Sequence, residues 1–190
     1  MAKYTKLSLH CFISVVKQLL TAPHVFYRQL PRGGGYVAPL LFVLILSFLP
    51  LFLPVVGKSY ELIANGAPVS VLQPALGWGF VFSLIGIPVT VVGSGVCFLI
   101  WKMHGSQQSY AVAFRCVSTL AVLVPFAVLV PPVPLAGVGI VLWGLYLLIV
   151  ASVEVHKMKA RDAWLTFGAL GSGWILSRLI SGVYLSRNAL

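Results

Sequence analysis

Acidic residues are almost absent from this sequence, which has only Glu61, Glu154 and Asp162 among its 190 residues. Charged residues of both signs make up 8% of the chain, whereas an average soluble domain carries roughly 25%. A chain of this length exposes much of its surface, and 59% hydrophobic residues leave too few polar side chains to cover it. This scarcity of charge excludes a water-soluble globular domain and indicates that lipid surrounds most of the chain.

Cysteine is also scarce, because Cys11, Cys97 and Cys116 are the only three and lie far apart. Without a C-x-x-C, H-x-x-x-H or H-E-x-x-H pattern, the sequence predicts neither a disulfide framework nor a metal site. It has no G-x-S-x-G motif, and no P-loop lysine follows the glycine run 33–35. We therefore expect no catalytic residues, no cofactor and no enzymatic activity.

Basic residues are plentiful by comparison, since thirteen Lys and Arg give a net charge of +10. Such a surplus can reflect binding to nucleic acid, contact with an anionic membrane surface, or membrane topology. The basic residues cluster at the ends of the apolar stretches, which is typical of membrane topology. We expect contact with the bilayer and its anionic lipid headgroups, and no nucleic-acid binding, because no polar domain remains to carry a basic face.

Long uncharged stretches separated by polar or proline-rich segments predict an all-α integral membrane bundle. The stretch from Val37 to Val56 is about 30 Å long as a helix, which matches the hydrocarbon thickness. The uncharged stretch 116–153 is too long for one crossing, and the prolines of segment 131–134 divide it into two. Five transmembrane helices result, at about 37–56, 75–101, 111–130, 134–153 and 163–184.

The last of these spans is the shortest in apolar length. Its uncharged part, Ala163 to Ser177, covers about 22 Å, so Arg178 has to extend outward for the crossing to close. With five spans, ten basic residues lie on one side and three on the other, which places the N-terminus in the cytoplasm and the C-terminus outside. A four-span arrangement with an interfacial last segment puts the C-terminus inside and stays open.

The N-terminal segment 6–20 has helical periodicity, with an apolar face and an opposite polar face. The apolar face contains Leu9, Phe12, Ile13, Val16, Leu19 and Leu20, and the polar face contains Lys6, His10, Ser14 and Lys17. This amphipathic helix either lies at the membrane surface or packs against the rest of the protein. A proline and glycine joint at 31–35 follows it, so we predict an N-terminal segment 1–32 and a transmembrane domain 33–190.

Three polar residues near the cytoplasmic ends of spans three and four form the candidate site: Arg115, Glu154 and His156. Glu154 directly follows the uncharged span 134–153, where an unpaired carboxylate is costly. We predict that Glu154 pairs with Arg115, or else with His156 or Lys157, and so holds the two spans together. The functional alternative is a proton-responsive site, because histidine titrates near neutral pH.

Three segments carry a family resemblance: "TAPHVFYRQLPRGGGYVAPLLFVLI" (21–45), "YAVAFRCVSTLAVLVPF" (110–126) and "LWGLYLLIVASVEVHKMKARDAW" (142–164). Over residues 20–185 the chain resembles the Yip1-domain family in its small prokaryotic form. The resemblance implies five spans, a cytoplasmic N-terminus and no known catalytic activity. Eukaryotic relatives bind small GTPases and shape early secretory membranes. The D-L-x-G-P-type motif and the Gly-Tyr before Pro125 are absent here, so we do not carry over the GTPase partner.

The sequence favours a non-enzymatic membrane-organising or interaction protein of Yip1 type in a bacterial plasma (inner) membrane. A membrane-protein partner and a homo-oligomer both stay open, because Gly168 with Ser172 and Ala169 with Gly173 can bring helices together. The alternative is a small transporter, channel or lipid-handling protein. In that case the pathway would run between spans kinked by proline.

Overall fold

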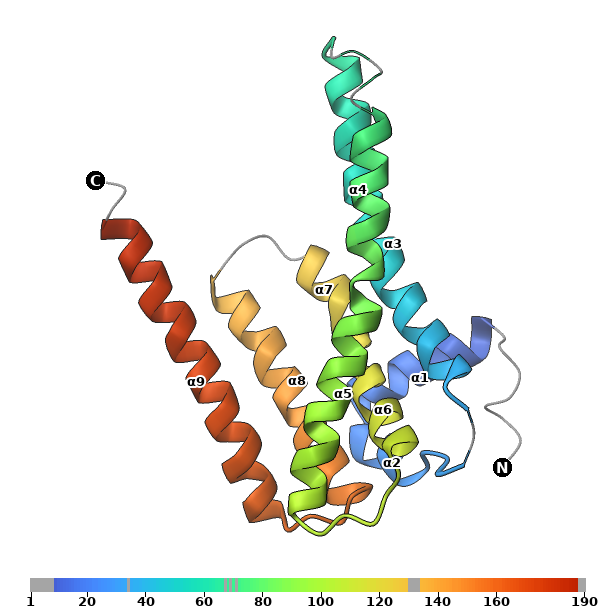
Figure 1. The fold of residues 1–190 in the computed structure, drawn as a ribbon, viewed down its shortest axis with the longest axis vertical. Coiled ribbons are helices and arrows are strands. Elements are labelled where there is room, and N and C mark those ends of the chain that lie inside the picture. Colours follow the sequence, from blue (N-terminus) through green and yellow to red (C-terminus); the bar gives the residue numbers. More distant parts are fainter. Residues whose placement is uncertain are drawn as a thin grey trace.

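The computed structural model describes residues 9–33, 35–66, 68, 70, 72–129 and 134–187. Within these residues all regular secondary structure is helical, which confirms the predicted all-α fold (Figure 1). Four helical stretches in the described part of the chain are long and apolar enough to cross a membrane: Val37–Ala64, Leu76–Met103, Tyr110–Val128 and Gly137–Glu154. The protein is therefore an integral membrane helix bundle, as its composition predicts.

The helices follow one another in a simple order along the described residues. They are α1 (Leu9–Thr21), α2 (Pro23–Arg28), α3 (Val37–Ala64), α4 (Leu72–Leu84), α5 (Gly86–Met103), α6 (Tyr110–Ser118), the 3-10 helix η2 (Thr119–Leu123), α7 (Val124–Leu129), α8 (Pro134–Glu154) and α9 (Ala160–Arg187). The fifth predicted span lies within α9. Crossing of the membrane by α9 stays a prediction.

Two of the differences from the sequence expectation have local physical reasons. Helix α3 runs eight residues past Val56, and the Lys58–Glu61 ion pair of 3.0 Å lies within this extension. It ends at Ala64 with Asn65 as its C-cap, and Gly66, with a φ of +89°, follows; a left-handed glycine is a common helix stop. The third span is interrupted by η2, because Pro125 has no N–H to bond the carbonyl of Ala121 and the preceding turn tightens.

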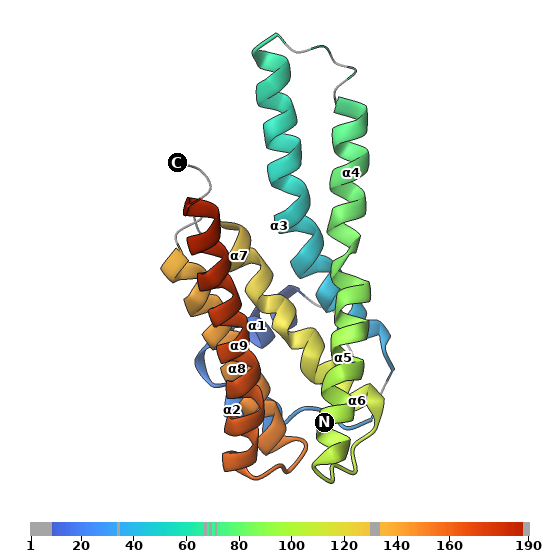
Figure 2. The ribbon, with the colours of Figure 1, turned by 60° about the vertical axis from the view of Figure 1, so that its left-hand side comes forward.

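Helices α3 and α4 form a hairpin that extends beyond the ends of the other helices (Figures 1 and 2). They approach closely, since a Cβ on Gly79 would lie 2.8 Å from a methyl carbon of Val55. Helix α9 lies at the edge of the bundle and packs against α8. The short helix α2 also packs against α8, so α8 contacts both α2 and α9.

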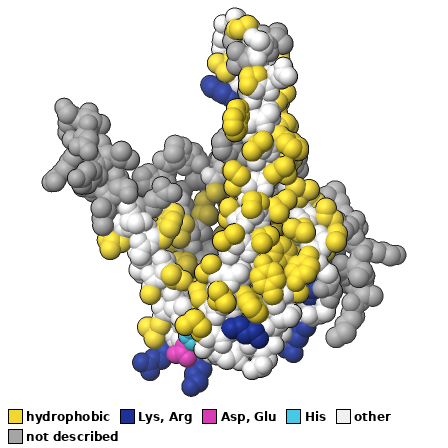
Figure 3. Space-filling model, in the orientation of Figure 1, with side chains coloured by type: hydrophobic (Ala, Val, Ile, Leu, Met, Phe, Trp, Pro, Cys, Tyr) yellow, Lys and Arg dark blue, Asp and Glu magenta, His cyan; other side chains and the backbone are white. Residues whose placement is uncertain are grey.

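The outer faces of the long helices are apolar, as a lipid environment requires. Large hydrophobic side chains are exposed along α4 and α5, and Figure 3 shows them covering one face of the molecule. They include Trp78, Phe80, Val89, Val92 and Leu99. Further exposed hydrophobic residues, Trp164, Leu165 and Leu170, lie on α9. These surfaces face lipid or another membrane helix.

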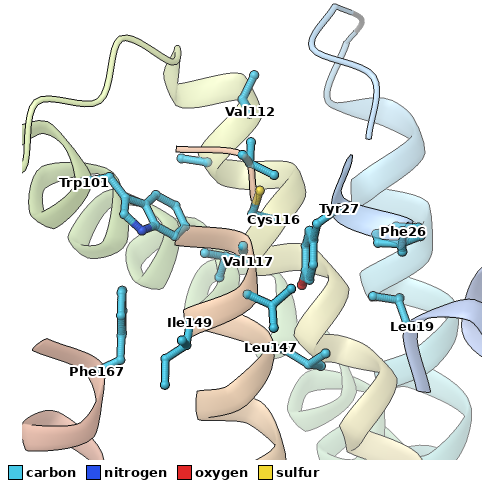
Figure 4. Close-up of a cluster of buried hydrophobic side chains, with 14 of the residues drawn as sticks. Leu19, Phe26, Tyr27, Trp101, Val112, Cys116, Val117, Leu147, Ile149 and Phe167 are labelled. Carbon is cyan, nitrogen blue, oxygen red and sulfur yellow. The ribbon is translucent and has the colours of Figure 1, made fainter. Parts of the chain in front are cut away.

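The buried core joins the N-terminal helices to the transmembrane bundle (Figure 4). Leu19 of α1 is 0% exposed, and Tyr27 of α2 is buried and hydrogen-bonded to Thr119 at 2.6 Å. The ring of Phe12 lies 5.3 Å from that of Phe42 on α3, while Ile13 stays exposed. Of the two readings of the amphipathic segment, the structure therefore favours a helix packed on the protein through much of its apolar face.

Candidate functional site

Glu154 ends helix α8 and is held by two basic side chains of α2. The Arg28 guanidinium donates from Nε to Oε2 at 2.8 Å and from Nη2 to Oε1 at 3.1 Å. His24 Nδ1 lies 3.0 Å from Oε1. The Glu154 side chain is 9% exposed, whereas that of Arg28 is 69% exposed. A nearly buried carboxylate therefore meets a guanidinium that still faces the surroundings.

The local sequence explains why one short helix supplies both partners. Pro23 occupies the first turn of α2, where its missing N–H costs nothing. His24 and Arg28 are four residues apart, so they project from the same helix face and reach one carboxylate. The hydroxyl of Tyr146 lies 3.2 Å from His24 Nε2. His24 therefore joins Glu154 and Tyr146 through its two ring nitrogens.

Arg115 lies elsewhere, in a buried position on α6 where it is 8% exposed. Its guanidinium donates to the carbonyl oxygens of Pro31 and Gly33, and to that of Gly35 at 3.5 Å. Through Pro31, Gly33 and Gly35 it holds the segment that connects α2 to α3, which we call the strap. The expected pairing of Arg115 with Glu154 is replaced by two separate contacts, because α2 reaches the carboxylate and the strap reaches the guanidinium.

His156 is in a third environment, in the turn that follows α8. Its ring stacks on Trp101 of α5 with centroids 3.7 Å apart, and its Nδ1 lies 2.9 Å from the hydroxyl of Ser106. Trp101 in turn donates to Ser152 at 2.7 Å. Burial, helped by the charge of Lys102, lowers the pKa of His156 to about 4. A neutral His156 joins α5, α8 and the loop 104–109, and it is not a partner of Glu154.

These contacts gather exposed basic residues from four segments at one end of the bundle. We call this surface the basic end; it comprises Arg28, Arg32, Lys102, Lys157, Lys159 and Arg161. Figure 3 shows Lys and Arg side chains at this end together with acidic and histidine side chains. At the tip of the α3–α4 hairpin, by contrast, Lys58 is paired with Glu61. The described charge distribution is therefore strongly asymmetric.

The sequence shows the two side chains that contact Glu154, but nothing in it indicates that they meet this residue. The "PHVFYR" segment carries two basic residues at helical spacing, yet they lie 126 and 130 positions from Glu154. Only the packing of α2 against α8 brings them together. No group of three or more His, Cys, Asp or Glu residues that could hold a metal ion occurs in the part of the chain that the structure describes.

The arrangement defines a class of protein: an α-helical membrane bundle with basic residues gathered at one end, where polar contacts hold the short N-terminal helix α2 against α8. A family profile for the Yip1 domain matches residues 17–177, and the chain belongs to the Yip1-domain family. The matched region starts within α1 and so includes α2 and the strap. No curated protein matches the chain. No solved structure matches it either.

Proposed function

We propose that this protein is a non-enzymatic membrane-organising or interaction protein that acts from a bacterial plasma (inner) membrane. The observation that supports it best is the basic end, where six exposed Lys and Arg from separate segments are brought together. The family supports the proposal as well, since Yip1-domain proteins organise membranes and are not known as enzymes.

The basic end fits the cytoplasmic side of the membrane. Cytoplasmic loops carry the excess of Lys and Arg in membrane proteins, which would place the N-terminus inside and, with α9 crossing, the C-terminus outside. Anionic headgroups attract basic residues near the surface by about 1 kcal/mol each. Salt weakens this attraction within a Debye length. A reporter fused after Leu190 tests the orientation, and a cytoplasmic signal there contradicts crossing by α9.

The exposed apolar faces of the long helices are surfaces through which such a protein can bind partners within the bilayer. On α9, an added Cβ at Gly168 or Gly173 would meet no atom within 4 Å, so another helix can approach its backbone closely. That helix belongs to a membrane-protein partner or to a second copy of the chain.

Photo-crosslinking in the membrane tests the proposal directly. A photoreactive residue at Leu170 on α9 or at Leu99 on α5, both exposed, should capture another protein or a second copy. The matched control is Leu147, which is fully buried and should give no intermolecular product. Adducts with lipid alone at both exposed positions would contradict an interaction role. Solute flux in proteoliposomes that disappears in Glu154→Gln would instead favour the transporter alternative.

A further inference from the structure

The guanidinium of Arg28 has unused hydrogen-bonding capacity. Arginine carries five N–H groups, and Arg28 donates two of them to Glu154. Within the described residues the other three have no acceptor, and the side chain is largely exposed. An arginine edge of this kind matches the oxygens of a phosphate group, because its N–H groups are parallel and permanently charged.

The depth of Arg28 in the bilayer follows from its partner. Glu154 is the last residue of the candidate span Gly137–Glu154, so the ion pair lies at the boundary between the hydrocarbon core and the headgroup layer. Val25, on the same short helix, is exposed and apolar. Along α2 the exposed side chains thus change from apolar to charged within one helical turn. A phospholipid changes in the same way between its acyl chains and its phosphate.

The charges around Arg28 select an anionic ligand. Glu154 neutralises Arg28, and Asp162 is the other acidic residue near this end of the bundle. The remaining members of the basic end contribute five positive charges. Charge complementarity therefore favours a lipid that keeps a net negative charge over a zwitterionic one.

We propose that the free edge of Arg28 binds the phosphate of one anionic phospholipid, whose acyl chains lie along the outer surface beside the α2–α8 contact. This site rests on the proposed function, because it gives the general attraction between the basic end and anionic lipid a specific position. Glu154 orients the guanidinium for the lipid through its two hydrogen bonds. Arg28 thus contacts both Glu154 and the phosphate of the lipid.

A pair of double variants separates a specific site from general electrostatics. Arg28→Gln with Glu154→Gln removes the site without leaving a buried carboxylate unpaired. Lys58→Gln with Glu61→Gln removes the other described Lys or Arg ion pair, at the far end of α3. Each double variant loses one positive and one negative charge, so the net charge of the protein is unchanged. Any difference in lipid response between the two double variants therefore reflects the position of the ion pair that was removed.

The measurement is thermal unfolding of the full-length protein in a non-ionic detergent, titrated with phosphatidylglycerol. Wild type and the Lys58/Glu61 variant should be stabilised at the same half-maximal lipid concentration. The Arg28/Glu154 variant should need at least about tenfold more lipid, equivalent to about 1.4 kcal/mol of binding free energy. Phosphatidylcholine should act more weakly on wild type, and diacylglycerol, which lacks phosphate, should not act at this site.

Three results would overturn the proposal: an unchanged lipid response in the Arg28/Glu154 variant, equal stabilisation by diacylglycerol, or the full effect from inorganic phosphate alone. Arg28→Lys supplies a test if the double variant does not fold, because it keeps the positive charge next to Glu154 and loses the planar edge. Its lipid response should be weakened, and a response equal to wild type would contradict the site. Absence of crosslinked proteins would refute the interaction role and leave this titration unaffected.

Discussion

Replacing Arg28 by glutamine tests whether the ion pair between Arg28 on α2 and Glu154 on α8 stabilises the fold. The substitution removes both guanidinium hydrogen bonds from a carboxylate that is only 9% exposed. Breaking a fully buried ion pair costs roughly 3–5 kcal/mol. Here His24 remains within 3.0 Å of the carboxylate, so we expect a smaller loss, close to the roughly 1–3 kcal/mol that it costs to leave one buried acceptor unsatisfied.

Equilibrium unfolding in detergent, followed by tryptophan fluorescence, measures this loss. The matched control is Lys58→Gln, which breaks an ion pair with both side chains more than 60% exposed. Such surface pairs contribute about 0–1 kcal/mol, so the control should be nearly as stable as wild type. The double variant R28Q/E154Q should recover part of the loss, because no charge is then buried alone. A loss no larger than that of the control, or no recovery in the double variant, would refute the reasoning.

Three further predictions concern other contacts of the bundle. Arg115→Gln should free the strap from α6 and speed protease cleavage between α2 and α3, whereas an unchanged cleavage rate contradicts its role. His156 has an ordinary pKa of 6.5 that burial lowers to about 4; the unfolded chain therefore binds more protons between these values. Neutral His156 should contribute on the order of 3 kcal/mol to the free energy of unfolding above pH 6.5, and this contribution should decline as the pH falls towards 4. In a pH titration of unfolding, His156→Phe should lack this pH-dependent component. Gly171→Val should destabilise the α8–α9 contact by about 1–3 kcal/mol, because the added Cβ would overlap Leu145. Gly173→Val should not destabilise it, because a Cβ there would meet no atom within 4 Å. Equal effects of the two variants on unfolding would contradict this contact.

Much of the fold could be predicted because the solvent is lipid. In hydrocarbon every backbone polar group needs an internal partner, so long apolar stretches become helices whatever their tertiary neighbours are. Details that depend on local chemistry were harder to predict. The extension of α3 includes a pair of opposite charges three residues apart, and the interruption before α7 depends on a single proline.

The candidate site could be predicted only in part. Glu154, Arg115 and His156 were identified because charge next to an apolar span needs compensation, and each does have specific polar contacts in the structure. Their partners could not be read from spacing, because the strap and α2 come from segments 80 or more positions away in the chain. The burial of His156 against Trp101 likewise left no periodic pattern to detect.

The sequence by itself determined that this protein is helical, lies in a membrane and carries its charge at the ends of its spans, since these properties depend on the transfer of individual segments into lipid. Tertiary structure alone decided that α2 packs on α8. That packing decides which cation meets Glu154, and the course of the strap decides which carbonyl groups bind Arg115. Such choices depend on distances between remote segments, and those distances exist only once the helices have packed.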